Sequence, residues 1–175
     1  VFGNDAWTVT STTTPVTDQF VKASNVWKYD PSVVIEIPEK SEASKIYFQA
    51  AVDYVWETYD VPNGCTNKGQ GYVSSYGNND YYSGASAYYG NVDWRVSAVR
   101  GGFTAAGMGD LTDDQIVEKL KEHTVEVFAA VLGYVYPTMT AEEYKKVVIN
   151  FYTYGPNATY TCAFEVVGTG EFQYV

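Results

Sequence analysis

The chain has 175 residues, of which 46% are hydrophobic, and its formal net charge at pH 7 is −10. A surface that binds phosphates needs clustered basic side chains, but the eleven Lys and Arg residues here form no run. The composition therefore excludes nucleic acid as a partner and disfavours anionic membrane surfaces. No apolar run approaches the roughly 18 residues of a membrane-spanning helix, so we also expect no membrane span.

Length and composition together predict a single globular domain, residues 1–175, that works outside the cytoplasm. A chain of this size can fold without disulfides or metal, and its seventeen tyrosines favour strands. Few lysines beside many Tyr, Thr, Asn and Gly residues are typical of exported bacterial proteins, which predicts an extracellular, periplasmic or cell-surface location. Val1 is not a natural start and indicates a processed N-terminus. Cys65 and Cys162 either form a disulfide or remain two free thiols.

The first forty residues contain two segments with the alternation of a strand. Residues 5–14 begin with alternating large apolar and polar side chains, and residues 33–37 place Val or Ile at every second position. Between them, residues 16–32 show no clean period and end in Asp-Pro-Ser, which predicts a turn at 30–32. Pro38 then ends the second predicted strand.

From residue 41 to about residue 59 the apolar positions change to a helical period. Two neighbouring apolar stripes both fit, so we expect a main helix of residues 41–59 that is covered on two sides. Its β-branched and aromatic content keeps a strand open as an alternative. The first stripe contains Ile46, Tyr47, Ala50, Ala51, Tyr54 and Val55, and the second contains Phe48, Val52, Trp56 and Tyr59.

The clearest element of the chain begins at Thr112. Thr112 and Gln115 have the spacing of a capping box, and Gly133 lies where a glycine commonly follows a helix. These signals predict a second main helix of residues 112–132, although its last turns also fit a strand. The single histidine of the chain, His123, lies in this helix, and we expect it at the surface.

The C-terminal part predicts an antiparallel hairpin of residues 147–154 and 159–167. A four-residue loop between them places Phe151 opposite Cys162, which turns one wholly apolar face inward and Cys162 into the core. Asn150 and other polar side chains then face outward. With the other elements, this hairpin predicts an α+β fold: an antiparallel β-sheet of several strands and hairpins, with the two main helices packed against it.

Glycine is concentrated in the middle of the chain, where ten of the fifteen glycines lie between residues 64 and 109. This concentration predicts loops at 63–79 and 100–111. Between them lies a tyrosine-rich segment, residues 80–95. Because a tyrosine ring offers contact area at little cost in side-chain entropy, this segment is our candidate for recognition.

Within the tyrosine-rich segment, Gly90-Asn91 is typical of a two-residue turn, which places Tyr89 opposite Val92. In that register Trp94 belongs to an apolar face and points into the core. The opposite, polar face supplies the candidate ligand-binding residues, which are Tyr82, Ser86, Tyr88, Asp93 and Arg95. The last three of these are close neighbours, either as an exposed ion pair with a cation–π contact or as the edge of a site.

Few catalytic chemistries fit the sequence. One histidine excludes zinc sites built on paired histidines, so we expect no metal and no cofactor. Residues 84–88 resemble a nucleophile elbow but lack its second glycine. Two carboxylates acting on a glycan remain the one catalytic route. The candidate pairs are Asp53 with Glu57, one helical turn apart, and Asp80 with Asp93, on either side of the aromatic rings.

The sequence therefore favours an exported, non-catalytic binding or interaction domain. Carbohydrate is the first ligand expected, because sugars stack on aromatic rings while amides and carboxylates bind their hydroxyls. The partner is then a glycan or another surface protein. Two alternatives remain open: a glycan-acting hydrolase with paired carboxylates, and a structural component of a cell-surface assembly. The tyrosines also fit ordinary strand residues that pack a core.

Overall fold

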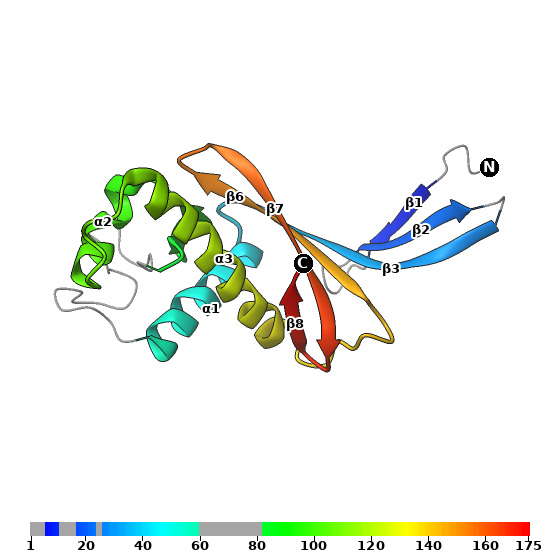
Figure 1. The fold of residues 1–175 in the computed structure, drawn as a ribbon. Coiled ribbons are helices and arrows are strands. Elements are labelled where there is room, and N and C mark those ends of the chain that lie inside the picture. The colour runs from blue at the N-terminus through cyan, green and yellow to red at the C-terminus, as the bar shows by residue number, and fades with distance from the viewer. Residues whose placement is uncertain (1–5, 11–16, 24–25, 60–81) are drawn as a thin grey trace.

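The computed structural model describes residues 6–10, 17–23, 26–59 and 82–175. This part of the chain forms a sheet with helices against one face (Figure 1). In chain order the elements are β1 (Ala6–Thr10), β2 (Thr17–Ala23), β3 (Val26–Ile37), α1 (Glu42–Thr58), β4 (Ala85–Ser86), β5 (Asn91–Asp93), α2 (Val96–Ala105), α3 (Asp113–Val135), β6 (Lys146–Tyr154), β7 (Ala158–Gly168) and β8 (Glu171–Tyr174). The predicted α+β class is confirmed.

Strand β6 is the centre of the sheet. On one side it pairs with antiparallel β7, which pairs with β8, and on its other side it pairs in parallel with β3 and then with β5. Antiparallel pairs extend β3 to β2 and β1, and β5 to β4. The sheet is therefore mixed, and the expected antiparallel pairing holds for part of it only. The chain between β3 and β6 contains the helices, and such a crossover brings strands together in parallel.

The core lies between the sheet and helices α1 and α3. Phe48 of α1 has its ring centroid 5.7 Å from that of Phe128 of α3 and 6.4 Å from that of Phe151 of β6. The rings of Phe128 and Phe151 stack at 4.8 Å, and all three side chains are buried. Burial of one such ring contributes roughly 2–3 kcal/mol. Strands β1 and β2 and the first half of β3 extend away from this core (Figure 1).

Both main helices begin at a capping residue, which the sequence predicted for Thr112 of α3. In α1 the hydroxyl of Ser41 accepts a hydrogen bond from the backbone N–H of Ser44, and in α3 the hydroxyl of Thr112 accepts one from that of Gln115. Helix α3 continues through Gly133 to Val135, so this glycine does not end the helix. A Cβ at position 133 would lie 2.7 Å from the carbonyl oxygen of Gly170, so the glycine permits close approach of the β7–β8 turn.

A third helix, α2, occupies residues expected to be strand and loop. The predicted register of the hairpin extends its second strand to residue 98, and the concentration of glycines predicted a loop at 100–111. In the structure Val99, Gly102 and Phe103 are buried on one side of α2. The burial of that side outweighs the low helix propensity of glycine.

The predicted turn at 30–32 is instead part of β3. The pairing of β2 with β3 shifts in register between Asp18 and Gln19, which lie opposite Val33 and Asp30. This irregularity accommodates Pro31, which cannot donate a hydrogen bond to a neighbouring strand. Strand β2 lies in the segment that showed no clean period in the sequence, and it pairs with β3 across this irregularity.

The C-terminal hairpin has the predicted faces but a different register. Phe151 lies opposite Tyr160 rather than Cys162, and Thr153 lies opposite Ala158. The difference is two positions, so each side chain keeps its side of the sheet and the hydrophobic pattern cannot distinguish the two registers. Cys162 is buried as expected and has a free thiol, whose pKa burial raises to about 12.

Candidate functional site

The tyrosine-rich segment forms a hairpin, but not in the predicted register. Ala85 lies opposite Val92 and Ser86 opposite Asn91, so a four-residue loop replaces the two-residue turn. Gly90, with a φ of +63°, closes this loop by donating its N–H to the carbonyl oxygen of Ser86 at 2.8 Å. The sequence pattern placed Gly90 in a turn, and this glycine does lie in one, but at the end of a longer loop.

The interior position of Trp94 is confirmed, although the register that predicted it was wrong. The indole is 4% exposed, and its Nε1 donates to the hydroxyl of Thr124 in α3 at 3.2 Å. The ring also meets Tyr160 of β7 edge to face, at 4.8 Å between centroids. Trp94 therefore joins the hairpin to the core and offers no platform for a ligand.

Three of the predicted ligand-binding residues bond to groups of their own hairpin. The buried hydroxyl of Ser86 accepts the backbone N–H of Tyr89. The carboxylate of Asp93 is 7% exposed and accepts hydrogen bonds from the backbone N–H, Nε and Nη2 of Arg95. The guanidinium of Arg95 lies 4.4 Å from the ring centroid of Tyr154, so its cation–π contact is with that ring.

Tyr88 and Tyr82 lie in different surroundings from one another. Tyr88 is 59% exposed, at the tip of the hairpin. Tyr82 lies in a stack: its ring is 3.5 Å from that of His123 and 4.2 Å from that of Tyr59, and its hydroxyl donates to Glu126 at 3.0 Å. Of the five predicted residues, Ser86 and Asp93 are therefore buried, whereas Tyr88 and Arg95 are exposed.

His123 is buried, which corrects the expected surface position. Its Nδ1 lies 2.9 Å from the carbonyl oxygen of Tyr82, and its ring stacks between the rings of Tyr82 and Phe103. Burial lowers the pKa of this imidazole, against the opposing effect of the carbonyl. The ring is thus a neutral part of the packing that holds the start of the hairpin to α3.

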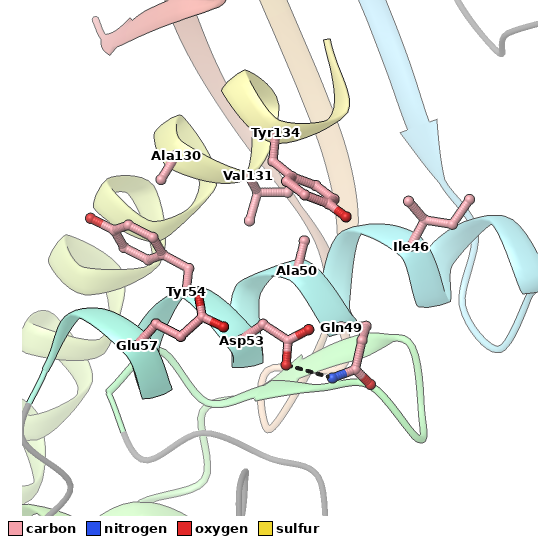
Figure 2. Close-up of a pocket in the computed structure, with 9 residues that line it drawn as sticks. All are labelled: Ile46, Gln49, Ala50, Asp53, Tyr54, Glu57, Ala130, Val131 and Tyr134. Atoms are coloured by element: carbon pink, nitrogen blue, oxygen red, sulfur yellow. Dashed lines mark hydrogen bonds between the residues drawn. The ribbon is translucent and has the colours of Figure 1, made fainter. Parts of the chain in front are cut away.

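An open groove lies elsewhere, between α1 and α3 (Figure 2). Its volume is about 480 Å³. Six lining residues come from α1 and three from α3: Ile46, Gln49, Ala50, Asp53, Tyr54, Glu57, Ala130, Val131 and Tyr134. We call it the α1–α3 groove. A concave surface of this size with an apolar floor and a few polar groups is the usual form of a small-molecule site.

The helical period of α1 produces the apolar side of the groove. Ile46, Ala50 and Tyr54 follow one another at intervals of four residues, so they form one row along the helix. The small side chains of Ala50 and of Ala130 in α3 keep the floor low between the larger ones. At its edge the ring of Tyr134 is 75% exposed, which leaves it accessible to a ligand (Figure 2).

A polar row runs beside the apolar one. Gln49, Asp53 and Glu57 also follow at intervals of four, and the amide of Gln49 donates to Asp53 at 3.0 Å. Figure 2 shows both carboxylates on the same side of α1. Glu57 makes no hydrogen bond or ion pair within the described residues. The groove therefore offers rings, apolar floor and hydrogen-bond acceptors together.

The sequence identified parts of this groove without identifying the groove. It paired Asp53 with Glu57, but it assigned Ile46, Ala50 and Tyr54 to a core stripe. The structure buries the neighbouring residues of α1 instead, which are Ser44, Tyr47, Phe48, Ala51, Val52 and Val55. The available signal was the excess of apolar residues on α1, since one helix face cannot bury two stripes.

The described residues also bear on two remaining expectations, the absence of a metal site and of a membrane span. They contain no group of three or more His, Cys, Asp or Glu side chains arranged to hold a metal ion. None of the helices in this part of the chain is long and apolar enough to cross a bilayer. The carboxylate pair of Asp80 and Asp93 cannot be described, because Asp80 lies outside these residues.

Comparisons of the chain with family models, with curated proteins and with solved structures found no match.

Proposed function

We propose that the protein is an exported, non-catalytic binding domain, and that its ligand is a carbohydrate held in the α1–α3 groove. The observation that carries the proposal is the exposed ring of Tyr134 beside a row of amide and carboxylate groups. A sugar ring has an apolar face that stacks on an aromatic side chain, while its hydroxyls donate to carboxylates. Gln49 and Asp53 supply such groups along the same wall.

The second candidate function, glycan hydrolysis, rests on the same two carboxylates. Asp53 and Glu57 belong to one helix, a single turn apart, and both line one wall of the groove. Glycoside hydrolysis needs an acid on each side of the scissile bond. The shared wall supports binding over hydrolysis.

The test is a glycan array followed by titration calorimetry of each glycan that binds. Tyr134→Ala should weaken binding about tenfold, because an aromatic contact of this kind contributes about 1.4 kcal/mol. Tyr88→Ala is the matched control, since it removes an exposed tyrosine from the hairpin, outside the groove. Absence of any glycan ligand would refute the proposal, and a loss confined to Tyr88→Ala would move the site to the hairpin.

The same glycans distinguish binding from hydrolysis. We expect no new reducing ends when they are incubated with the protein. Release of reducing sugar that is abolished by Asp53→Asn or Glu57→Gln would establish the hydrolase instead. Both variants replace a carboxylate by an amide of nearly equal size, so they remove acid–base chemistry with little change in shape.

A further inference from the structure

One chemical motif of the sequence lies outside both the groove and the tyrosine-rich hairpin. Asn157, Ala158 and Thr159 form Asn-X-Thr, the acceptor motif of N-linked glycosylation, in which X is any residue except proline. Of the nine asparagines of the chain, Asn157 is the one that has Ser or Thr two residues later. The motif therefore occurs once, and its place in the fold determines whether an enzyme can reach it.

The motif lies at the exposed tip of the hairpin of β6 and β7. Thr153 pairs with Ala158, so the chain turns through residues 154–157, and Figure 1 shows this turn at the end of the two strands. All three residues of the motif are exposed. An N-linked oligosaccharide is bulky and needs an attachment point at the surface, and loop tips are the segments that other enzymes reach most easily. The tip of this hairpin meets both requirements.

The turn leaves the amide nitrogen of Asn157 accessible. The hydroxyl of Tyr152 donates to Oδ1 of Asn157 at 3.1 Å. Within the described residues, Nδ2 of Asn157 makes no hydrogen bond, and neither does the hydroxyl of Thr159. Asn157 has a φ of +50°, which asparagine adopts more readily than most residues. The nitrogen that would react and the hydroxyl that the motif requires are thus both available.

Two tyrosine rings lie beside the motif. In β6 the buried residues Phe151 and Thr153 alternate with Tyr152 and Tyr154, which face away from the core. Thr159 lies directly opposite Tyr152, and the ring of Tyr154 is 42% exposed. Because the apolar face of a sugar stacks on aromatic rings, these side chains offer a surface on which the first attached sugar can pack.

We infer that Asn157 is a site of N-linked glycosylation. The donor is an oligosaccharide joined through C1 to a lipid diphosphate, and the enzyme is an oligosaccharyltransferase of the export pathway. A bond forms between Nδ2 of Asn157 and C1, while the bond between C1 and the diphosphate oxygen breaks. Nδ2 loses one proton and the lipid diphosphate leaves, so no group is oxidised or reduced.

This inference shares only one element with the proposed function, which is the export of the chain. It depends on neither the groove nor its ligand, because the described lining of the groove contains none of residues 154–159. The two proposals can therefore fail separately.

The test is peptide mass spectrometry of the protein isolated from the cells that produce it naturally. We expect the peptide with Asn157 to carry an oligosaccharide, and an amidase that releases N-linked glycans to leave aspartate at this position. An exported protein whose Asn157 peptide has its unmodified mass would overturn this inference and leave the proposed binding in the groove intact. A chain found only inside the cell would overturn this inference together with the proposed export.

Three variants produced in the same cells connect the modification to the motif. Thr159→Ala should abolish it, whereas Thr159→Ser should retain it, because serine keeps the hydroxyl that the motif requires. Thr161→Ala is the matched control, since it removes another exposed threonine of β7 outside the motif, and it should leave the modification unchanged. Modification of Thr159→Ala at the wild-type level would overturn the inference.

Discussion

The hairpin of residues 82–95 and the α1–α3 groove contain the same kinds of side chain in different states. In the hairpin, the hydroxyl of Ser86 and the carboxylate of Asp93 bond to neighbouring groups of the hairpin itself, and the indole of Trp94 bonds to α3. In the groove, Glu57 and Tyr134 face solvent. Tyrosines beside acids therefore do not distinguish a structural cluster from a binding surface, whereas the state of their hydrogen bonds does.

The reason for the difference is how much backbone pairing each region has. Strands β4 and β5 share only two residue pairs and β5 shares two more with β6, so side-chain bonds add to a short backbone ladder. Helix α1 satisfies its own backbone, and its buried side already fixes it to the core. Its outer rows are consequently free to vary without loss of structure. Three measurements test this difference between the hairpin and the groove.

The largest effect is expected from Asp93→Ala in the hairpin. This change removes a buried carboxylate that accepts hydrogen bonds from both the backbone and the side chain of Arg95. Hydrogen bonds to a charged group are worth about 2 kcal/mol, so the free energy of unfolding should fall by about that amount. Urea unfolding at neutral pH measures it. If Asp93→Ala leaves the unfolding midpoint where it was, the hairpin does not depend on this ion pair.

The next effect is the pH dependence that His123 contributes. Its pKa is lowered in the folded state, so the unfolded chain binds the proton more readily. The stabilisation is complete above the unfolded pKa of about 6.5 and is lost as the pH falls through that value toward the folded pKa. One group can change the unfolding free energy by at most about 1.4 kcal/mol per pH unit.

The measurement is the unfolding free energy from pH 8 to pH 5, for the wild type and His123→Gln. The charged residues around the imidazole, Lys119, Glu122 and Glu126, are the same in both proteins, so the difference isolates the histidine. We expect a steeper loss toward acid in the wild type. Parallel curves would contradict the role of a neutral, buried His123 in anchoring the hairpin.

The smallest effects on stability are expected in the groove. Tyr134→Ala and Glu57→Gln each change an exposed side chain without a bond to the rest of the described structure, so each should shift the unfolding free energy by less than about 0.5 kcal/mol. The same urea titration tests this expectation. A loss as large as that of Asp93→Ala would make the groove a structural region and remove the contrast with the hairpin.

Local signals in the sequence predicted the two main helices well. The apolar period located α1, and the capping box of Thr112 and Gln115 located the start of α3 and forms the expected bonds. Gly133 misled the prediction of a helix end, because its role is close contact with Gly170, far away in the chain. Helix α2 was missed for a similar reason, since burial of Phe103 outweighs its glycines.

The candidate site shows the same limit. The sequence separated two apolar stripes on α1, but the buried side of the helix takes residues from both of them. Phe48 contacts Phe128 and Phe151, and this contact turns Ile46 and Ala50 toward the groove. Likewise, the sequence found Asp93 and Arg95 but not the burial of Asp93, nor the ring of Tyr154 beside Arg95.

Local period and local capping were sufficient to predict where α1 and α3 begin and which side chains of β6 and β7 face inward. The parallel pairing of β3 with β6, the register of the hairpin and the position of the groove follow only from the tertiary structure. Each of these depends on which distant segments pack together, and packing selects among arrangements that satisfy the same local pattern equally well.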